Sequence, residues 1–387
     1  MNDYFDTIVL EDQVDKTTTV TSGTETIDLP DVGYLSQVNL RAAALAQWVD
    51  EFALPMYHII SKVELLVNGS QVVKSLTGRQ IRALAWYHGM DLINLGTYSR
   101  GGQGEKTFWT FPILLGTKPY DPNCMLDLSQ YSNPQLRVTW NAADTSTDGV
   151  SWDVSSSPTF RYGVDCILYR GTPGNVKGYI KSSEIDSWTT ANSQIHRTEI
   201  PKGQELLGLS VEGRYTLLSN LNFFSRLKLN FDNGAWIPLD HTYDSLRALY
   251  ATWWNRNVQV GIYKSIADGD THDFMVGEID GFSFLSETSS LGHIILAGAE
   301  YPIYTINCLR SDGGAAHSTR ADVHIWTRGY MPHQTYYIPM WGFLGGDWNT
   351  LDTTKYGRID LETTLGSAAG TSATERVCAE YLVPNGQ

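Results

Sequence analysis

The chain lacks the basic clusters with which proteins neutralise nucleic-acid phosphates. Its 28 Lys and Arg residues are outnumbered by 42 Asp and Glu residues, which gives a formal net charge of −14. Residues 1–16 carry five acidic groups and one lysine, and neither end of the chain is rich in Lys or Arg. Because wrapping of nucleic acid needs such clusters, we expect no direct nucleic-acid binding.

Long apolar runs and paired cysteines are also missing. No run of about 18 apolar residues occurs, so we expect no membrane-spanning helix. The first six residues lack the basic and apolar regions of a signal peptide. The four cysteines have no CxxC spacing and no histidine at zinc spacing, and we predict buried, reduced thiols in a cytosolic setting. They are Cys124, Cys166, Cys308 and Cys378.

Catalytic motifs are incomplete throughout. The loop Ser99–Thr107 resembles a phosphate-binding loop, but Glu105 separates Gly104 from Lys106. The segment Gly208–Gly213 misses the nucleophile-elbow pattern by one residue, and the nine histidines stand singly, without HExxH or HxH. We therefore predict that the protein is not an enzyme and has no catalytic, cofactor-binding or metal site.

One acidic segment leaves an alternative open. Asp268–Asp273 places three carboxylates within six residues, and hard oxygen ligands could hold calcium there. The order of an EF-hand loop is absent, so a solvated acidic turn is the favoured interpretation. His272-Asp273 could also belong to a catalytic triad, but no nucleophile turn accompanies it.

The residues that are abundant indicate packed β-structure. Hydrophobic residues make up 42% of the chain and charged residues 18%, which supports a packed core and argues against disorder. Aromatic residues at 12% and 35 glycines are typical of many strands joined by many turns. A length of 387 residues suits two domains.

An internal repeat supports the same division. Each of six blocks in the first half has a counterpart in the second half, in the same order, and this order indicates a duplicated domain. The matched blocks are Asp28-Leu29-Pro30 with Glu199-Ile200-Pro201, Leu35/Val38/Leu40 with Leu206/Leu209/Val211, Ser61–Val67 with Ser225–Phe231, Ile81–Leu84 with Leu246–Leu249, Trp109–Pro112 with Tyr336–Pro339, and Leu126-Asp127 with Leu351-Asp352. Further pairs are Tyr131 with Tyr356, Leu136/Val138 with Ile359/Leu361, and Cys166/Tyr169 with Cys378/Tyr381.

Each copy predicts a hairpin followed by a helix. Alternating apolar residues lead into Asn68-Gly69 in the first copy and into Asn233-Gly234, after one inserted residue, in the second. Thr77 and Thr242 are expected to begin the two helices, the first ending near Gly89.

The second copy is longer than the first by about 62 residues, between Leu249 and Pro339. We predict an insertion of strands within about 255–335 that projects from the roll and ends in the polar loop Ser311–Arg320. The expected domains are an N-terminal arm (1–18), a first roll (19–180) and a second roll (181–387), connected near Gly171–Trp188. We expect each roll to keep its own sheets, with no continuous sheet across both halves.

These features resemble the double jelly-roll major capsid proteins, the lineage of tectiviruses, corticoviruses and adenoviruses. The resemblance covers about residues 19–387 and is carried by the hairpin and helix of Ser61–His88, by Phe111–Gly116 with Asp121 and Leu126–Leu128, and by Leu136–Trp140, a series that returns after Leu206. It implies an all-β fold of two tandem jelly rolls, each with a short helix.

The resemblance also implies a function. It implies homotrimers with a pseudo-hexameric outline, icosahedral shells often built over an internal membrane, and location in the virion after assembly in the host cytoplasm. Implied partners are neighbouring capsomers, penton and minor capsid or membrane proteins, and a host surface reached by the outer loops. The missing basic arm suits a shell separated from its genome.

A carbohydrate-binding adhesin is the alternative function. Aromatic platforms on a β-sandwich bind sugars, and Trp253-Trp254 and Trp341 could supply one. The competing interpretation places these aromatic residues in the cores or in subunit contacts.

Overall fold

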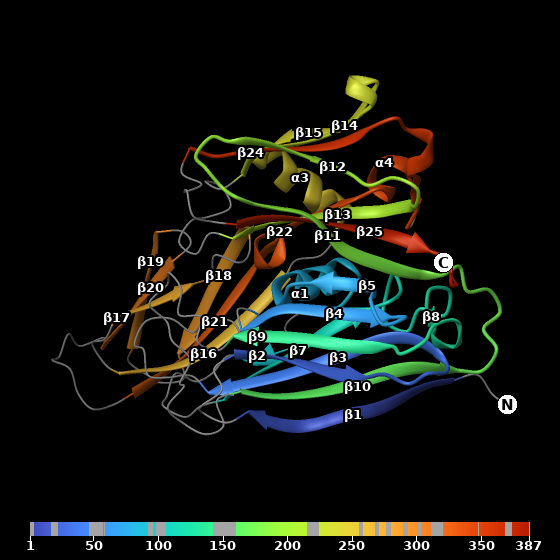
Figure 1. Ribbon diagram of the computed structural model, residues 1–387. Helices are drawn as coiled ribbons and strands as arrows, with labels where there is room; N and C mark the ends of the chain where they lie inside the picture. Colours follow the sequence, from blue (N-terminus) through green and yellow to red (C-terminus); the bar gives the residue numbers. More distant parts are fainter. Residues whose placement is uncertain are drawn as a thin grey trace.

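The computed structural model describes residues 4–16, 22–45, 57, 59–91, 96–97, 106–141, 160–214, 224–254, 258–267, 271–275, 280–288, 293–300, 303–310, 320–346, 348–367 and 374–386. Within these ranges, residues 44–45, 96–97, 106–108, 214 and 258–328 are described by their backbone alone. Figure 1 shows sheets stacked as successive layers, with residues 4–170 in the lower layers, residues 179–254 and 335–383 in the upper ones, and the strands within 258–330 to the left.

The first half of the chain forms a roll of eight main strands in two sheets. The sheets have the orders β1-β10-β3-β7 and β2-β9-β4-β5, while β6 extends the first sheet and β8 pairs with the start of β3. The strands are β1 (Tyr4–Lys16), β2 (Ser22–Asp28), β3 (Tyr34–Leu45), β4 (Ile60–Val67), β5 (Gln71–Leu76), β6 (Gly96–Thr97), β7 (Lys106–Leu114), β8 (Leu126–Asp127), β9 (Gln135–Asn141) and β10 (Phe160–Arg170).

The second half repeats this arrangement. Its sheets have the orders β11-β25-β13-β22 and β12-β24-β14-β15, and β23 pairs with the start of β13 as β8 does with β3. The strands are β11 (Tyr179–Thr189), β12 (Ile195–Glu199), β13 (Glu205–Arg214), β14 (Phe224–Phe231), β15 (Trp236–Thr242), β22 (Thr335–Pro339), β23 (Leu351–Asp352), β24 (Ile359–Leu365) and β25 (Thr374–Val383).

The strand order identifies the fold. Counted along either half, the main strands lie in the order 1-8-3-6 in one sheet and 2-7-4-5 in the other. Two facing sheets with this double Greek-key order make a jelly roll. The chain is therefore an all-β protein built of two tandem jelly rolls, which confirms the predicted fold class.

Strand pairing shows which repeat blocks are equivalent. Asp28 at the end of β2 pairs with Gln135, and Glu199 at the end of β12 pairs with Asp360. Leu126-Asp127 and Leu351-Asp352 pair at matching places with β3 and β13. Ser61–Val67 and Ser225–Phe231 likewise fall in corresponding strands, β4 and β14. These predicted matches are confirmed.

Two predicted matches are wrong by two residues. Leu40 pairs with Phe111 and its counterpart Val211 pairs with Tyr336, so Phe111 corresponds to Tyr336 and not to Ile338. By the same comparison, Leu136 corresponds to Leu361 rather than to Ile359. A two-residue slip leaves every side chain on its original face of the strand, so the hydrophobic pattern could not reveal the error.

The match between the last strands is wrong by one residue. Val38 pairs with Cys166, whereas its counterpart Leu209 pairs with Ala379, so Cys166 corresponds to Ala379 and not to Cys378. Cys166 and Cys378 were matched because both are cysteines. Cys378 nevertheless lies on the opposite face of β25 from Ala379, the true counterpart of Cys166.

The two rolls are joined by a sheet that continues from one to the other. Ser182 and Ser183 of β11 pair in parallel with Lys74 and Ser75 of β5, so one sheet runs from β2 through β5 and β11 to β22. The expectation that no sheet would cross both halves is wrong. The connection is two residue pairs long, and each roll keeps its own pair of sheets.

The ends of the rolls also differ from the expected limits. Tyr4–Lys16 is not an arm but the first strand of the first roll, β1, which pairs with β10 along its length. The link between the rolls spans residues 171–178, because β11 already begins at Tyr179. β1 and β11 are counterparts, each pairing with the last strand of its roll.

Both hairpins and both predicted helices form. Asn68 and Gly69 have φ values of 52° and 80°, as a tight two-residue turn requires, and Asp232–Gly234 contains the one additional residue. α1 (Gly78–Tyr87) has a capping box between Thr77 and Gln80 and ends before Gly89. α3 (Tyr243–Trp253) starts after Thr242. The remaining short helices are η3 (Leu128–Gln130), η4 (Asp232–Gly234), η5 (Pro332–Gln334), α4 (Trp341–Leu344) and η6 (Thr353–Lys355).

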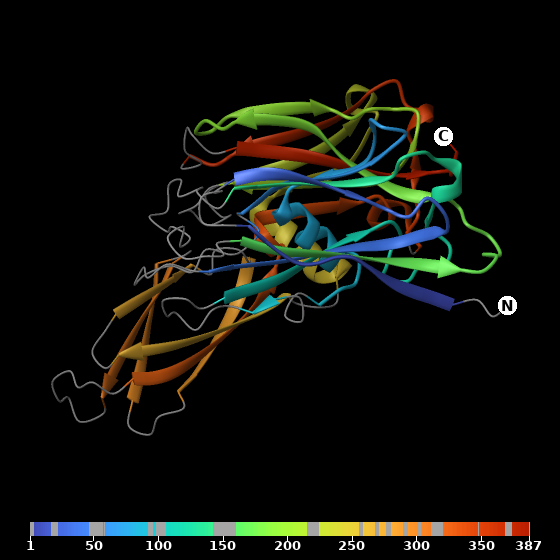
Figure 2. The same ribbon diagram turned by 60° about the horizontal axis from the view of Figure 1, so that its bottom comes forward.

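The insertion lies between α3 and β22. The spacing between the copies is 165 residues at the helices and 225 at β7 and β22, so the surplus is 60 residues rather than about 62. Its strands form two three-stranded sheets, β16-β21-β18 and β17-β20-β19, which extend away from both rolls in Figure 2. They are β16 (Val258–Ala267), β17 (Thr271–Met275), β18 (Asp280–Thr288), β19 (His293–Glu300), β20 (Ile303–Arg310) and β21 (Arg320–Tyr330).

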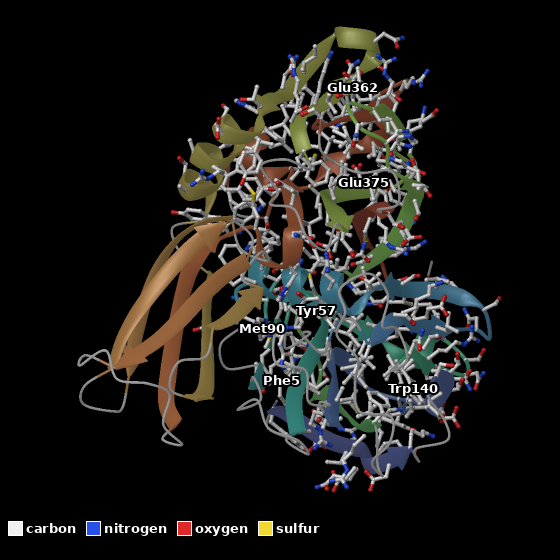
Figure 3. The ribbon with its side chains drawn as sticks, turned by 90° about the vertical axis from the view of Figure 1, so that its left-hand side faces the viewer. Phe5, Tyr57, Met90, Trp140, Glu362 and Glu375 are labelled. Carbon is white, nitrogen blue, oxygen red and sulfur yellow. The ribbon has the colours of Figure 1, made fainter. Side chains whose placement is uncertain are left out.

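The buried apolar residues of the two rolls form one connected core. In Figure 3, Trp140 lies inside the first roll, Glu375 lies in the second, and Tyr57 lies near the boundary between them. Cys124, Cys166 and Cys378 are buried free thiols, as predicted, while the side chain of Cys308 lies outside the described part of the chain.

Candidate interaction surfaces at the junction of the rolls

The junction between the rolls is built around α1 of the first roll. Every residue of α1 is buried, because the helix packs on β7 of its own roll and on β13, β22 and η5 of the second roll. Such complete burial is unusual for an amphipathic helix at the edge of a β-sandwich, whose polar face normally meets water. Polar side chains of α1 therefore find partners inside the protein: Arg82 donates to the carbonyl oxygen of Thr110 in its own roll, and Arg79 reaches the second roll.

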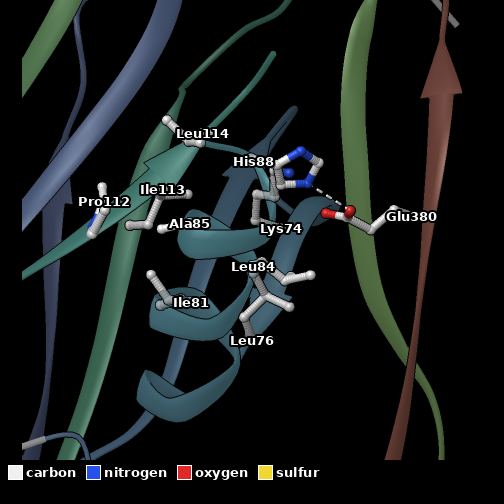
Figure 4. A pocket seen from close by; sticks show the side chains of 10 residues that line it. All are labelled: Lys74, Leu76, Ile81, Leu84, Ala85, His88, Pro112, Ile113, Leu114 and Glu380. Atoms are coloured by element: carbon white, nitrogen blue, oxygen red, sulfur yellow. Dashed lines mark hydrogen bonds and ion pairs between the residues drawn. The ribbon is translucent and has the colours of Figure 1, made fainter. Parts of the chain in front are cut away.

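A buried carboxylate from the second roll supplies one set of partners. Glu380 accepts hydrogen bonds from Ser182 Oγ at 2.7 Å and from Tyr337 OH at 2.9 Å, and its Oε2 lies 2.8 Å from His88 Nε2. Lys74 Nζ donates to Ser182 Oγ at 2.7 Å, which links the ammonium group to the carboxylate. Figure 4 shows His88 and Lys74, both from the first roll, beside Glu380.

Burial and charge set the pKa values in this cluster. Burial alone would raise the pKa of Glu380, but the neighbouring His88 and Lys74 and the Ser182 hydroxyl lower it to about 2. Burial lowers the pKa of Lys74 to about 8, against an opposing effect of Glu380. Near neutral pH the carboxylate is therefore ionised, and its charge is compensated from the other roll.

A second buried carboxylate receives the start of α1. Glu212 of β13 accepts a hydrogen bond from Thr77 Oγ1 at 2.9 Å and lies 3.8 Å from Arg79 Nε. Arg79 also donates to Gln334 at 3.1 Å. The rolls are thus joined by two groups of buried hydrogen bonds and ion pairs, one at each end of α1.

Aromatic rings fill the space between these polar groups. Tyr87 stacks on Tyr337 at 5.2 Å, and Trp254 packs edge-on against Tyr87 at 4.8 Å. Trp254 is only 7% exposed, and Trp253 and Trp341 are half-buried against the same cluster. These three residues, which could have formed a sugar-binding platform, therefore contribute to the packing of the junction.

The other segments considered as sites lie in strands or outside the described residues, and one of them, Gly208–Gly213, contributes Glu212 to this junction. His272 and Asp273 lie in β17, paired with Ile306 and Thr305, so this part of the acidic segment is a strand and not a turn. Residues 268–270 and 99–105 lie outside the described part of the chain. Gly208–Gly213 forms part of β13, as the repeat predicted.

The described part of the chain has neither a side-chain group suited to a metal ion nor a helix suited to crossing a bilayer. In that part of the chain, no three His, Cys, Asp or Glu side chains are grouped so that they could hold a metal ion. None of its helices combines the length and the apolar character needed to cross a bilayer.

Sequence reasoning did not predict the buried charges at the junction. The alternation of apolar and polar residues along a strand predicts which side chains face the core of a roll and which face away from it. It does not predict that the side facing away, which carries Lys74, Glu212 and Glu380, is covered by the other roll. Their charge did not distinguish the two cases, because strands on the open surface of a sandwich and strands in a polar interface both carry polar residues.

This architecture places the chain in a structural class, the double jelly-roll proteins. No family model matches the chain, and no curated protein sequence does. Among solved structures, the chain is similar to the major capsid protein of Sulfolobus Turreted Icosahedral Virus, with a TM-score of 0.59, 13% identity, and coverage of 98% of this chain and 97% of that one. It is also similar to a chain of the PBCV-1 virus capsid, with a TM-score of 0.55, 9% identity, and coverage of 98% and 93%. The TM-scores and coverages show a shared fold over nearly the full length of these chains.

Proposed function

We propose that the protein is a major capsid protein that self-assembles as pseudo-hexameric homotrimers tiling an icosahedral shell. The observation that supports this most is the double jelly-roll match to the virus capsid proteins over nearly the whole length of the chain. Fold alone does not define function, so the proposal depends on assembly.

The physical properties of the fold suit that role. A jelly roll pairs most of its strand edges and encloses a rigid core, so each roll acts as a stiff block. Two rolls in one chain give a trimer six similar blocks around a closed axis, which can tile a lattice with six neighbours. The buried ion pairs and aromatic rings at the junction hold the two blocks in one orientation.

The proposal includes partners and location. The protein would reside in the virion after assembly in the host cytoplasm, in contact with neighbouring capsomers, penton and minor capsid or membrane proteins. An internal membrane beneath the shell suits a chain of net charge −14 without a basic arm. We propose no catalytic activity and no cofactor.

Oligomeric state tests the proposal. We expect size-exclusion chromatography with mass measurement to give a homotrimer, held by a large interface as stable assemblies require. A free module that binds glycan as a monomer would instead favour the adhesin.

The insertion is proposed to be a tower on the outer face of the shell, with a role in host contact or in support of neighbouring towers. We expect limited proteolysis of intact particles to cut first within Ser311–Arg320, because polar loop tips are the preferred sites of nicking. Cleavage elsewhere on the surface, with this segment protected, would mean that the tip is buried and that the tower proposal is wrong.

A further inference from the structure

The chain contains three Asn-Gly sequences, which begin at Asn68, Asn233 and Asn385. In such a sequence the backbone nitrogen of the glycine can attack the side-chain amide carbon of the asparagine, because glycine has no side chain to hinder the approach. The asparagine then loses its amide nitrogen. In the folded protein, the readiness of each asparagine to react depends on what holds its side chain.

The side chain of Asn68 is held at both atoms of its amide. Its Oδ1 accepts hydrogen bonds from Ser132 N at 2.9 Å and from Ser132 Oγ at 3.2 Å, and its Nδ2 donates to Gln71 Oε1 at 2.9 Å. These bonds join the turn between β4 and β5 to the segment that precedes β9. Attack by Gly69 N draws the amide carbon towards the backbone, so it requires these bonds to break.

Asn385 is held in a similar way near the end of the chain. Its Nδ2 donates to Met125 O at 3.1 Å, and its Oδ1 accepts a hydrogen bond from Asp127 N at 2.9 Å. The attacking nitrogen is engaged as well, because Gly386 N donates to Tyr131 OH at 3.0 Å. Both groups that would react at this sequence are therefore occupied.

Asn233 differs from the other two. It is exposed, and within the described part of the chain its side chain takes part in no hydrogen bond, ion pair or ring contact. A Cβ built on Gly234 would meet no atom within 4 Å, so the space around the attacking residue is open. No side-chain contact has to break before the Asn233 amide turns towards Gly234 N.

The repeat explains why the Asn233 side chain is unattached. At the spacing of 164 residues that relates β4 to β14, the counterpart of Asn68 is Asp232. Asp232 N donates to Arg358 O at 2.9 Å, and Asp232 Oδ1 accepts from Arg358 N at 2.9 Å. Asn68 makes the same two contacts with Ser132. Asn233 is the residue inserted into the second hairpin, and the contacts that hold this hairpin do not use its side chain.

We propose that Asn233 is a site of spontaneous deamidation, which Asn68 and Asn385 resist. Gly234 N gives its proton to hydroxide and bonds to Asn233 Cγ. The Cγ–Nδ2 bond then breaks, and the released nitrogen takes a proton from water and leaves as ammonia. Water adds to one carbonyl carbon of the resulting succinimide ring and breaks the bond from that carbon to the ring nitrogen, which leaves aspartate or isoaspartate. The reaction needs no oxidant or reductant.

The product differs from asparagine in charge and in shape. Each event adds one negative charge to a chain whose formal net charge is −14, at the turn between β14 and β15. The isoaspartate form also lengthens the backbone within a turn in which Asp232, Asn233 and Gly234 have φ values of 48°, 56° and 103°. The modification therefore alters an exposed turn of the second roll and leaves its buried core unchanged.

Peptide mapping of the aged protein tests the proposal. The purified full-length protein is kept folded in mildly alkaline buffer made with heavy-oxygen water, then digested in ordinary water and analysed by mass spectrometry. Only residues converted before digestion carry heavy oxygen. We expect Asn233 to convert at least about tenfold faster than Asn68 or Asn385, because breaking two or more hydrogen bonds adds to the barrier of the reaction.

Two controls assign the difference to the folded structure. In concentrated guanidinium all three sequences lose their contacts, so their rates should converge. In the folded variant with Gln71→Ala and Ser132→Ala, two of the three bonds to Asn68 are missing, and conversion of Asn68 should be faster than in the wild type. Asn233→Gln should abolish the fast release of ammonia.

Three results would overturn the proposal. The first is an equal rate at the three sequences of the folded protein, and the second is faster conversion at Asn68 or Asn385 than at Asn233. The third is an Asn233 that stays intact in the folded protein, since the turn itself would then protect it. Fast conversion at Asn233 that disappears as a difference on unfolding supports the proposal.

Discussion

Replacing Glu380 with alanine is expected to cost about 3–5 kcal/mol of the free energy of unfolding, because it leaves the buried ammonium group of Lys74 without its partner. Lys74 and His88 of the first roll both face this carboxylate of the second roll. Without this carboxylate, the two side chains lose their partner across the junction, so the contact between the rolls is weakened as well as β25 itself. Urea unfolding of the purified protein measures the effect.

A surface ion pair provides the control for this variant. Arg197 Nε lies 2.8 Å from Glu362 Oε2, and the Arg197 side chain is 66% exposed. Arg197→Ala should cost no more than about 1 kcal/mol, as exposed pairs usually do. Equal losses in the two variants would mean that the junction charges add little to stability.

The pH dependence of this effect follows from the lowered pKa of Glu380. A carboxyl whose pKa is lower in the folded than in the unfolded chain stabilises the fold above its ordinary pKa of 4.5. That contribution is lost as pH falls from 4.5 toward the folded value of about 2. The difference in stability between wild type and Glu380→Ala should therefore shrink as pH falls below 4.5.

Gly178→Ala is expected to destabilise the protein by about 3 kcal/mol, through backbone strain together with overpacking. Gly178 has a φ of 138°, a conformation that L side chains rarely adopt, and a Cβ there would collide with the carbonyl oxygen of Val383. The residue also joins the rolls, because its own carbonyl accepts a hydrogen bond from Met125 N at 2.8 Å. The substitution should displace the start of β11.

Gly174 is the matched control in the same link. A Cβ built there meets no atom within 4 Å, and its φ is not in the left-handed region. Gly174→Ala should change stability by less than about 1 kcal/mol or raise it slightly, since alanine restricts the unfolded chain. Thermal unfolding of the two variants checks the prediction, and a Gly178→Ala variant as stable as Gly174→Ala would contradict it.

The fold was predictable because the same physical pattern occurs twice. Alternation along Ser61–Val67 and its copy, the Asn-Gly turns, and the threonines before α1 and α3 are local signals that tertiary packing did not override. The alignment of Phe111 and Leu136 failed for a physical reason. Strands shifted by two residues bury the same faces, so alternation fixes the face but not the register.

The junction could not be predicted in the same way. Residues Tyr4–Lys16 carry an excess of acidic groups and resemble a solvated arm, yet they pair with β10 because their backbone completes a sheet. The pairing of β5 with β11, and the meeting of Lys74 with Glu380, depend on how two folded rolls sit together. Local sequence patterns contain no information of that kind.

The oligomeric particle in solution tests the central claim most directly. We predict a mass three times that of the 43.2 kDa chain, and electron-microscopic class averages of that particle with six corners formed by three pairs of rolls. A monomer at high concentration, or an assembly whose averages show an outline other than six-cornered, would contradict the account.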